Sequence, residues 1–176
     1  MRVQLSGTGN LSLAEVMVLG TGGVAAPTNL ALASLATQSS TLPGSGSANS
    51  AALAVDGNTD GGYYDGSVTH TNTDVNAWWQ TDLRTSVSIS SIVIWNRTDC
   101  CSERLNDYWV FVSDTPFLAT DTPATLMNRA GTIARHQTSA PNPSTTINVT
   151  GTGRYVRVQL SGTNNLSLAE VQVYGQ

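Results

Sequence analysis

The 176-residue sequence predicts an all-β protein, a β-sandwich of the jelly-roll type. Gly, Ser, Thr and Asn are abundant, the helix formers Glu and Gln are scarce, and lysine is absent. This composition favours short strands joined by turns over helices. Several short segments also alternate between apolar and polar residues, with turn signals between them, which is typical of two packed sheets.

An internal repeat sets the predicted domain boundaries. Residues 2–20 recur almost unchanged at residues 157–175, and only Gly9, Met17 and Leu19 differ from their counterparts. We expect residues 1–20 to be a remnant of the last two strands of a preceding tandem domain, residues 21–28 to be a linker, and residues 29–176 to be the domain. The alternating pattern of residues 1–20 predicts pairing with a sheet. Strand exchange in a homo-oligomer is one interpretation, and an unattached arm is the other.

The elements of the domain follow in chain order. Residues 29–40 form a first extended segment, residues 43–47 a Gly/Ser/Pro loop, and residues 51–67 a short apolar piece followed by an acidic, turn-rich loop. Alternation predicts a strand over residues 87–95. Further strands are expected at residues 108–113, 145–149, 155–160 and 168–174, and residues 116–143 are expected to be mostly loop with one candidate strand at residues 132–136.

Charge and hydropathy exclude two classes of partner. Charged residues make up 11% of the chain, the net charge is -4, and every basic residue is arginine. A nucleic-acid surface is excluded because phosphate binding needs a basic field. The sequence has no apolar run of about 20 residues, so membrane insertion is excluded. Adjacent cysteines favour an oxidising compartment, so we predict secretion, with the signal outside this sequence. The lysine-free composition indicates a bacterial source.

One stretch of the chain combines unusual chemistry. Residues 96–104 read Asn-Arg-Thr-Asp-Cys-Cys-Ser-Glu-Arg and follow directly on the predicted strand 87–95. Arg97 and Arg104 offer rigid forks of N–H donors, which is how a protein reads the hydroxyl groups of a neutral sugar. We expect His70 to donate to an axial hydroxyl, and Asp99 to orient both arginines and offset their repulsion.

Each of these residues also has an ordinary interpretation. A lone histidine is usually a surface or core residue, and an Arg-Asp pair is usually a salt bridge of little worth. Adjacent cysteines can close only a very small ring, and a redox role for them is an alternative, although redox motifs usually separate their cysteines by two residues. Only the combination of these residues favours a binding site.

The spacing of His70, then Arg97-x-Asp99, then Arg104 resembles the motif of the F-type lectins. These fucose-binding lectins share the β-sandwich of the discoidin and coagulation-factor C-type domains. The flanking segments agree: Asn-Leu-Ala-Leu at residues 29–32, Ala-Val-Asp-Gly-Asn-Thr-Asp at 54–60, Trp-Trp-Gln-Thr-Asp-Leu at 78–83 and Leu-Ala-Glu-Val-Gln-Val at 168–173. The resemblance covers residues 29–175. It also indicates that at least one of Trp78 and Trp79 is a core residue.

The resemblance implies that the domain has a complete binding site for fucose, and that its partners are fucosylated glycans. His70, Arg97 and Arg104 are expected to hydrogen-bond to fucose, with Asp99 beside them. Cys100 and Cys101 are expected to form a disulfide that packs against the sugar ring as a stiff apolar ledge. An apolar wall is expected around the 6-deoxy methyl group, made by Leu42, Tyr63 and Tyr64. Such a wall discriminates only modestly against a sugar with a hydroxyl there.

The resemblance also implies a structural calcium ion. Residues 56–61 copy the first half of an EF-hand loop, but position twelve is Ser67 in place of Glu and no helices are expected on either side, so an EF-hand is excluded. The ligands implied are side-chain or main-chain oxygens of Leu53, Asp56, Asn58, Ser67, Ala169 and Glu170. A plain turn with solvated side chains is the alternative.

Together these features predict a non-catalytic lectin module that recognises terminal L-fucose. The alternative is a discoidin-type adhesion or lipid-binding module on the same scaffold. Catalysis is excluded because the sequence shows no recognisable catalytic triad, carboxylate pair or transition-metal cluster. His136 has no such context and receives no role.

Overall fold

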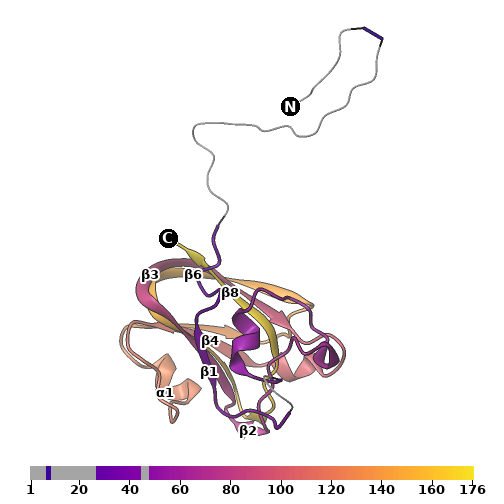
Figure 1. Cartoon of the computed structure of the whole chain (residues 1–176). Helices are drawn as coiled ribbons and strands as arrows, with labels where there is room; N and C mark the ends of the chain where they lie inside the picture. Colours follow the sequence, from indigo (N-terminus) through magenta and orange to yellow (C-terminus); the bar gives the residue numbers. More distant parts are fainter. Residues whose placement is uncertain (1–6, 9–26, 45–47) are drawn as a thin grey trace.

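The chain forms a β-sandwich, seen here in a computed structural model that describes residues 7–8, 27–44 and 48–176 (Figure 1). The predicted all-β class is confirmed. Our predictions for the remnant and most of the linker fall outside the described residues, so strand exchange stays a prediction. The three positions at which the repeat differs correspond to Asn164, Gln172 and Tyr174, which are only half-buried in the domain.

Eight strands and four short helices make up the described chain. The strands are β1 (Leu35–Gln38), β2 (Asp74–Val75), β3 (Trp78–Asn96), β4 (Tyr108–Ser113), β5 (Thr132–Gln137), β6 (Ser144–Leu160), β7 (Thr163–Asn164) and β8 (Leu168–Gly175). Three helices are 3-10 turns, η1 (Ala51–Val55), η2 (Tyr63–Asp65) and η3 (Ser102–Leu105), and one is an α-helix, α1 (Pro123–Met127).

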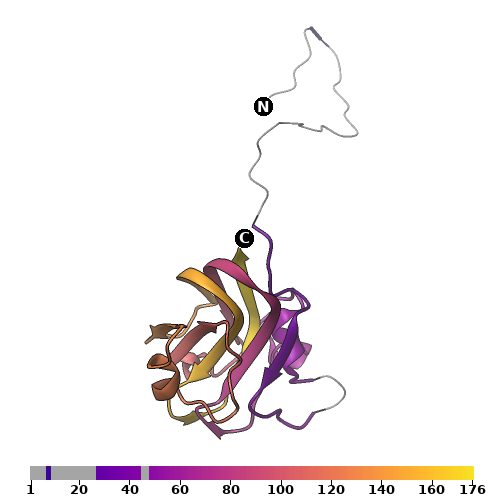
Figure 2. The same ribbon diagram turned by 90° about the vertical axis from the view of Figure 1, so that its left-hand side faces the viewer.

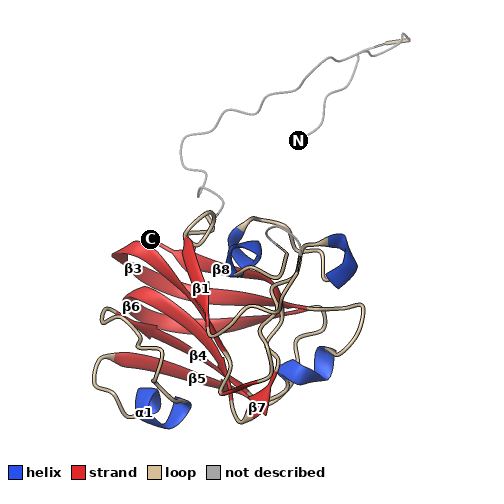
Figure 3. Ribbon diagram, turned by 60° about the horizontal axis from the view of Figure 1, so that its bottom comes forward, coloured by secondary structure: helices blue, strands red, loops and turns tan. Residues whose placement is uncertain are grey.

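The two long strands, β3 and β6, are curved and connect the layers of the sandwich (Figures 2 and 3). The main sheet has the order β1-β3-β6-β4-β5, and all of its pairs are antiparallel. The first part of β3 pairs with β1, and its last part pairs with β8. Between them the register of the β3–β6 ladder breaks from Asp82 to Val87, and such irregularities bend a sheet. Strands β2 and β7 form a separate two-stranded ribbon.

Alternation along each half of β3, interrupted by the two register shifts of its ladder with β6, builds the core. Trp79, Leu83, Ile89, Ile92 and Ile94 are buried, while their neighbours are half-buried or exposed. The inward residues of β4, β6 and β8 join them in one apolar cluster, as expected when period-two patterns face each other across two layers. Trp79 is fully buried and its Nε1 donates to the carbonyl of Ala51 at 2.9 Å. The prediction that one of the two tryptophans is a core residue is therefore confirmed.

Several predicted boundaries were wrong for identifiable reasons. The predicted strand 87–95 is only the second half of β3, and the predicted strands 145–149 and 155–160 are one strand, β6. The extended segment 29–40 is a turn followed by β1. The region 116–143 contains β5, as expected, and also helix α1. Thr122 caps this helix in a capping box with Thr125 and a proline follows at its first turn, a start signal that the sequence analysis did not use.

The outer face of the sheet carries a second, smaller set of aromatic residues. Phe111, Phe117 and Leu126 form a separate buried cluster against which Trp109 packs. On the same face Arg157 is fully buried, and its guanidinium lies 4.5 Å from the ring centre of Trp78. The segment that carries Phe117 and α1 thus covers part of this face (Figure 3). Among the described helices, none is long and apolar enough to cross a membrane.

The buried tryptophan provides a test of the core. Replacing Trp79 by alanine removes its packing and its bond to Ala51, so we expect the free energy of unfolding to fall by about 3–5 kcal/mol in urea titrations. Leu35→Ala is the control, because Leu35 is 69% exposed and its loss should change the value by no more than about 0.5 kcal/mol. Equal effects of the two substitutions would contradict this packing.

Candidate functional site

The buried side chain of Asn96 shapes the first half of the site. Strand β3 ends at Asn96, whose Nδ2 donates to the carbonyls of Ser102 at 3.0 Å and Pro141 at 3.1 Å. Its Oδ1 accepts from the backbone N–H of Arg97 at 2.9 Å. These bonds close the chain into a tight loop, and η3 then carries Arg104. Asn96 is 3% exposed, so the sequence Asn-Arg-Thr at this position is not open to glycosylation in the folded domain.

The second half of the site comes from residues 61–70. The N–H of Thr98 donates to the carbonyl of Gly61 at 2.9 Å, which joins the two halves. A Cβ atom on Gly61 would lie 2.8 Å from the carbonyl oxygen of Asn96, so only glycine permits this approach. His70 is held by its own backbone, which bonds to the carbonyl of Asn49 and to the N–H of Leu42.

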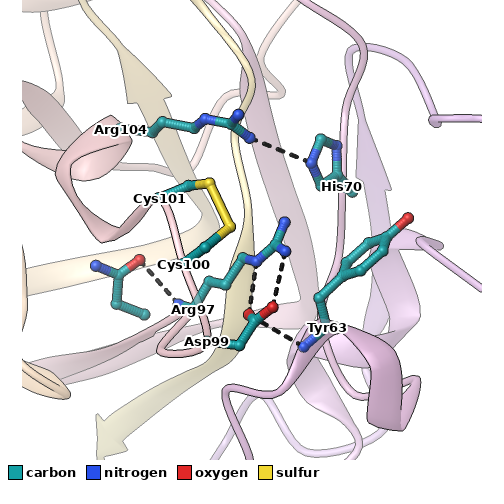
Figure 4. Close-up of a disulfide and its surroundings, with 8 residues drawn as sticks. Tyr63, His70, Arg97, Asp99, Cys100, Cys101 and Arg104 are labelled. Carbon is teal, nitrogen blue, oxygen red and sulfur yellow. Dashed lines mark hydrogen bonds and ion pairs between the residues drawn. A yellow bond between two sulfur atoms is a disulfide. The ribbon is translucent and has the colours of Figure 1, made fainter.

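These halves bring together the three residues predicted to bind fucose (Figure 4). Nη1 of Arg104 lies 3.5 Å from Nε2 of His70, a long contact. Arg97 lies on the same side of the loop and points toward the segment that carries His70. Arg97 and His70 are 7% and 5% exposed, so their positions are fixed by packing. The predicted clustering of His70, Arg97 and Arg104 is what the structure shows.

The tautomer of His70 differs from our expectation. Its Nδ1 lies 2.7 Å from the carbonyl oxygen of Thr71, which can only accept, so Nδ1 carries the proton. Nε2 of the neutral ring is then an acceptor, and the expected donation to a hydroxyl was wrong. The pKa of His70 is lowered from its usual value, chiefly by burial and further by the charges of Arg97 and Arg104, although the bond to Thr71 opposes this.

Asp99 pairs with one arginine only. Its two carboxylate oxygens accept from Nε of Arg97 at 2.7 Å and Nη2 at 2.9 Å, and Oδ1 also accepts from the N–H of Tyr63 at 3.3 Å. The hydrogen bond from Arg97 lowers the pKa of Asp99 to about 2, and the same bond raises the pKa of Arg97. Asp99 therefore orients Arg97 and neutralises its charge, whereas we had expected it to serve both arginines.

A disulfide lies between the two arginines. Cys100 and Cys101 are bonded to each other, with Cα atoms 3.8 Å apart and Cys101 in the left-handed region at φ 59°. Cys100 is exposed and Cys101 is half-buried, so the sulfur atoms form part of the surface between Arg97 and Arg104 (Figure 4). The structure thus contains the disulfide that the resemblance implied.

Aromatic contacts line the side of the site opposite the disulfide loop. The ring centre of Tyr63 lies 4.4 Å from the guanidinium of Arg97 and 5.5 Å from the ring of His70. Tyr64 meets Tyr63 edge-on at 5.4 Å and is 88% exposed. Leu42 is half-buried and adjoins His70 through its backbone N–H. Tyr63 is therefore an integral part of the cluster, Leu42 is its neighbour, and Tyr64 is at its rim.

The predicted calcium loop packs against β8. Glu170 is fully buried, and its Oε1 accepts from the N–H of Gly57 at 3.2 Å. Its Oε2 has no partner among the described residues. Burial, with the nearby charge of Asp56, raises the pKa of Glu170 to about 7. A fully buried carboxylate with an unpartnered oxygen fits a cation site.

The remaining oxygens complete this neighbourhood. Leu53 belongs to η1, which packs on β8, and Ala169 precedes Glu170. Asn58 accepts from the N–H of Asp60, and Ser67 donates to the carbonyls of Asp60 and Gly62. Within the described residues no three His, Cys, Asp or Glu side chains form a metal-binding group. The residues predicted to hold calcium offer two carboxylates and four neutral oxygen atoms, which is the type of ligand that calcium takes.

Residues outside the sequence motif also shape the site. Asn96, Thr71 and Gly61 were not among the residues predicted to form the site. Each acts through contacts between segments that are distant in the chain. The only feature of the sequence that could have indicated them is their position next to Arg97, His70 and the acidic loop.

Comparisons with known proteins place this site in context. The family described as the NedA-like, galactose-binding domain matches residues 53–158. Fucolectin-6 of Anguilla japonica is 37% identical over 147 residues, which cover 82% of this chain and 74% of the relative. The fucose binding module of Streptococcus pneumoniae superposes with a TM-score of 0.73 at 30% identity, over 88% of this chain and 100% of that one. The f-lectin from Morone saxatilis serum gives 0.71 at 36% identity, over 85% of this chain and 49% of that one.

The Arg97–Asp99 pair provides a test of this geometry. In a carbon-detected NMR titration we expect the carboxyl group of Asp99 to titrate near pH 2, because Arg97 stabilises its charged form. Arg97→Gln should return the midpoint toward the ordinary value of 3.8. Since the folded pKa lies below the unfolded one, the pair stabilises the fold at higher pH, and this contribution is lost as the pH falls from about 4 toward 2. Arg84→Gln, at an exposed bend of β3, is the control. An unchanged midpoint in Arg97→Gln would exclude the pair.

Proposed function

The chain belongs to the fucolectin family of F5/F8 type C-like domains, and from this we propose that it is a lectin that binds terminal L-fucose on glycans. Like its relatives, which are lectins and carbohydrate-binding modules, it is a binding module and not an enzyme. The observation that carries the proposal is the convergence of His70, Arg97 and Arg104 beside an exposed disulfide, on loops held by buried hydrogen bonds.

The arrangement of donors and acceptors suits a neutral sugar. Nε and Nη2 of Arg97 face Asp99, so its Nη1 stays available for ring hydroxyls. Arg104 adds a second planar fork, and Nε2 of His70 adds an acceptor. A hydroxyl can accept from Arg104 and donate to His70 at once. The rigid arrangement therefore reads the direction of a hydroxyl without requiring any charge on the ligand.

The disulfide and Tyr63 supply the apolar contacts that we propose for the sugar. The disulfide, between the exposed Cys100 and the half-buried Cys101, offers a stiff, polarizable surface against which we propose that a ring face packs. Leu42 and Tyr63 adjoin His70 and are the residues that we propose to contact the 6-deoxy methyl group, with Tyr64 at the outer edge. L-Galactose differs from L-fucose by a hydroxyl on that carbon, so it is the ligand that tests this wall.

Calorimetric titration with L-fucose tests the function directly. Arg104→Lys keeps the charge but removes the planar fork, so we expect the affinity to fall at least about tenfold, or 1.4 kcal/mol. L-Galactose should bind the wild-type protein about 10-fold more weakly than L-fucose. Arg84→Lys should leave both affinities unchanged. Absence of heat with L-fucose, or equal binding of D-glucose and L-fucose, would overturn the proposal.

The affinity should depend on pH through His70. The neutral ring accepts a hydroxyl proton at Nε2, and protonation of this atom removes the acceptor. Because the pKa of His70 is lowered, we expect constant affinity above about pH 6.5, and a loss approaching tenfold per unit once the pH falls below the lowered pKa. His70→Gln should bind more weakly with no such pH dependence. A wild-type affinity that stays constant down to the lowest pH at which the protein remains folded, or a His70→Gln variant that binds as tightly as the wild type, would exclude this role for His70.

We propose that the acidic loop holds a structural calcium ion. The ion would be held by the side chains of Asp56, Asn58, Ser67 and Glu170 and by the carbonyls of Leu53 and Ala169. Its positive charge would balance the negative charge of the buried Glu170 carboxylate. The loop lies only a few residues before His70, so the ion would link β8 to the binding site. Its role is structural and no catalytic step depends on it.

Calcium should therefore stabilise the protein. At free calcium about 100 times its Kd we expect the melting temperature to rise by about 5–10 °C relative to protein in EDTA. Glu170→Gln should remove this response, whereas Glu103→Gln, at an exposed position of η3, should keep it. A melting temperature that is the same in calcium and EDTA would argue against the ion.

We also propose that the protein is secreted. Disulfides form and persist mainly in oxidising environments, and the f-lectin from Morone saxatilis comes from serum. A bacterial source, strand exchange through residues 1–20 and a preceding tandem domain stay predictions. A single sugar site binds weakly, so several sites in one molecule or assembly would increase avidity.

A further inference from the structure

A cavity separate from the proposed fucose site lies on the outer face of the sheet. Its volume is about 330 Å³, and none of His70, Arg97 and Arg104 lines it. Trp78 and Gln159 contribute from the main sheet, and the other walls come from the ends of β1 and β2 and from the segment before α1. The lining residues are Ser39, Asp74, Val75, Asn76, Trp78, Ala119, Thr120, Asp121, Thr122 and Gln159. A volume of this size matches small-ligand sites.

Gln159 gives this cavity a fixed polar group. It is fully buried, and its Nε2 donates to the carbonyls of Asn76 and Asp121, each at 3.0 Å. These two bonds fix the orientation of the amide. Its Oε1 has no hydrogen-bond partner in the part of the chain that the structure describes. The side chain is 0% exposed, so Gln159 acts from behind the cavity wall, where its two bonds hold Asn76 and Asp121 in place.

Trp78 gives the cavity a rigid aromatic group. The guanidinium of Arg157 lies 4.5 Å from its ring centre. Arg157 is itself held by Gln80 Oε1, at 3.0 and 2.7 Å, and by the carbonyl of Leu118 at 2.9 Å. An aromatic ring fixed in this way beside a few polar groups is the usual composition of a small-ligand site. The proposed fucose site does not use the ring of Trp78.

The charges around the cavity favour a neutral ligand. Asp74 accepts from Ser39 at 2.7 Å and Ser40 at 2.5 Å through Oδ2 alone, which leaves Oδ1 as an acceptor. Asp121 is already paired with Arg129 at 3.3 Å. The two carboxylates repel anions, and the charge of Asp121 is offset by Arg129 and by the buried Arg157 behind Trp78. A neutral molecule rich in O–H donors suits this combination better than an ion.

We propose that this cavity is a second carbohydrate site, which takes a neutral hexopyranose against Trp78 with a hydroxyl group donating to Asp74, between walls that Gln159 holds in place. It shares no residue with the fucose site, so neither site depends on the other. Asp74 is the fourth residue after His70, which limits the distance between their Cα atoms to about 14 Å. One short glycan can therefore reach from one site to the other, and occupation of both would raise its affinity.

Nitrogen-labelled protein saturated with L-fucose allows the second site to be tested alone. D-Galactose, D-glucose and D-mannose are titrated in turn to about 50 mM, which covers the weak binding of a single ring. The indole N–H of Trp78, assigned from Trp78→Phe, reports on the cavity. We expect at least one hexose to shift this resonance with saturation, while the signals of His70, already occupied by fucose, stay in place.

Two substitutions then test the polar contacts. Asp74→Asn and Gln159→Met should each weaken that hexose at least about fivefold, with unchanged affinity for L-fucose. Asp114→Asn, an exposed carboxylate outside the cavity, should change neither. If none of the three hexoses shifts Trp78 while L-fucose binds normally, the second site is overturned and the fucose site stands. If L-fucose itself does not bind, the primary proposal fails, and the hexose titration still decides the second site. Gln159 is buried, so a failure of Gln159→Met to fold leaves the decision to Asp74→Asn.

Discussion

The binding surface depends on the buried amide of Asn96. A strand that ends at the surface would leave its following loop free to adopt many conformations, and ordering them costs entropy. Asn96 satisfies two carbonyls and one N–H from inside the loop and from Pro141. Because these bonds are buried, breaking any of them leaves an unsatisfied polar group. The loop therefore has one conformation, and Arg97 and Arg104 inherit fixed positions from it.

The second constraint is the contact between this loop and the acidic loop. The Thr98–Gly61 hydrogen bond and the Tyr63–Asp99 bond connect segments that are more than thirty residues apart in the chain. On its other side the acidic loop reaches Glu170 of β8 through Gly57. The site is thus supported by β3 from one side and by β8 from the other.

Local patterns in the sequence predict part of this arrangement, and contacts made only in the folded chain decide the rest. The inward residues of β3 were predictable because alternation is a local property, whereas the length of β3 was not, since Arg84 to Ser86 are exposed and read as a turn although the strand continues through them. The residues of the site were predictable from the spacing of His70, Arg97 and Arg104. The tautomer of His70 and the choice of Asp99 between two arginines were not, because the nearest carbonyl and the nearest guanidinium are set by folding.

The two arginines differ in whether a carboxylate neutralises them, and this difference explains why the site suits a ligand hydroxyl group. Asp99 neutralises Arg97, but Arg104 has no carboxylate partner among the described residues. Its charge instead faces Nε2 of His70 across a long contact of 3.5 Å, and it adds to burial, the larger cause, in lowering the pKa of His70. A carboxylate placed here would bond to Arg104 but would find another acceptor at His70, and an ammonium group would meet the reverse conflict. A hydroxyl accepts from Arg104 and donates to His70 together, so it is the one simple group that satisfies both residues.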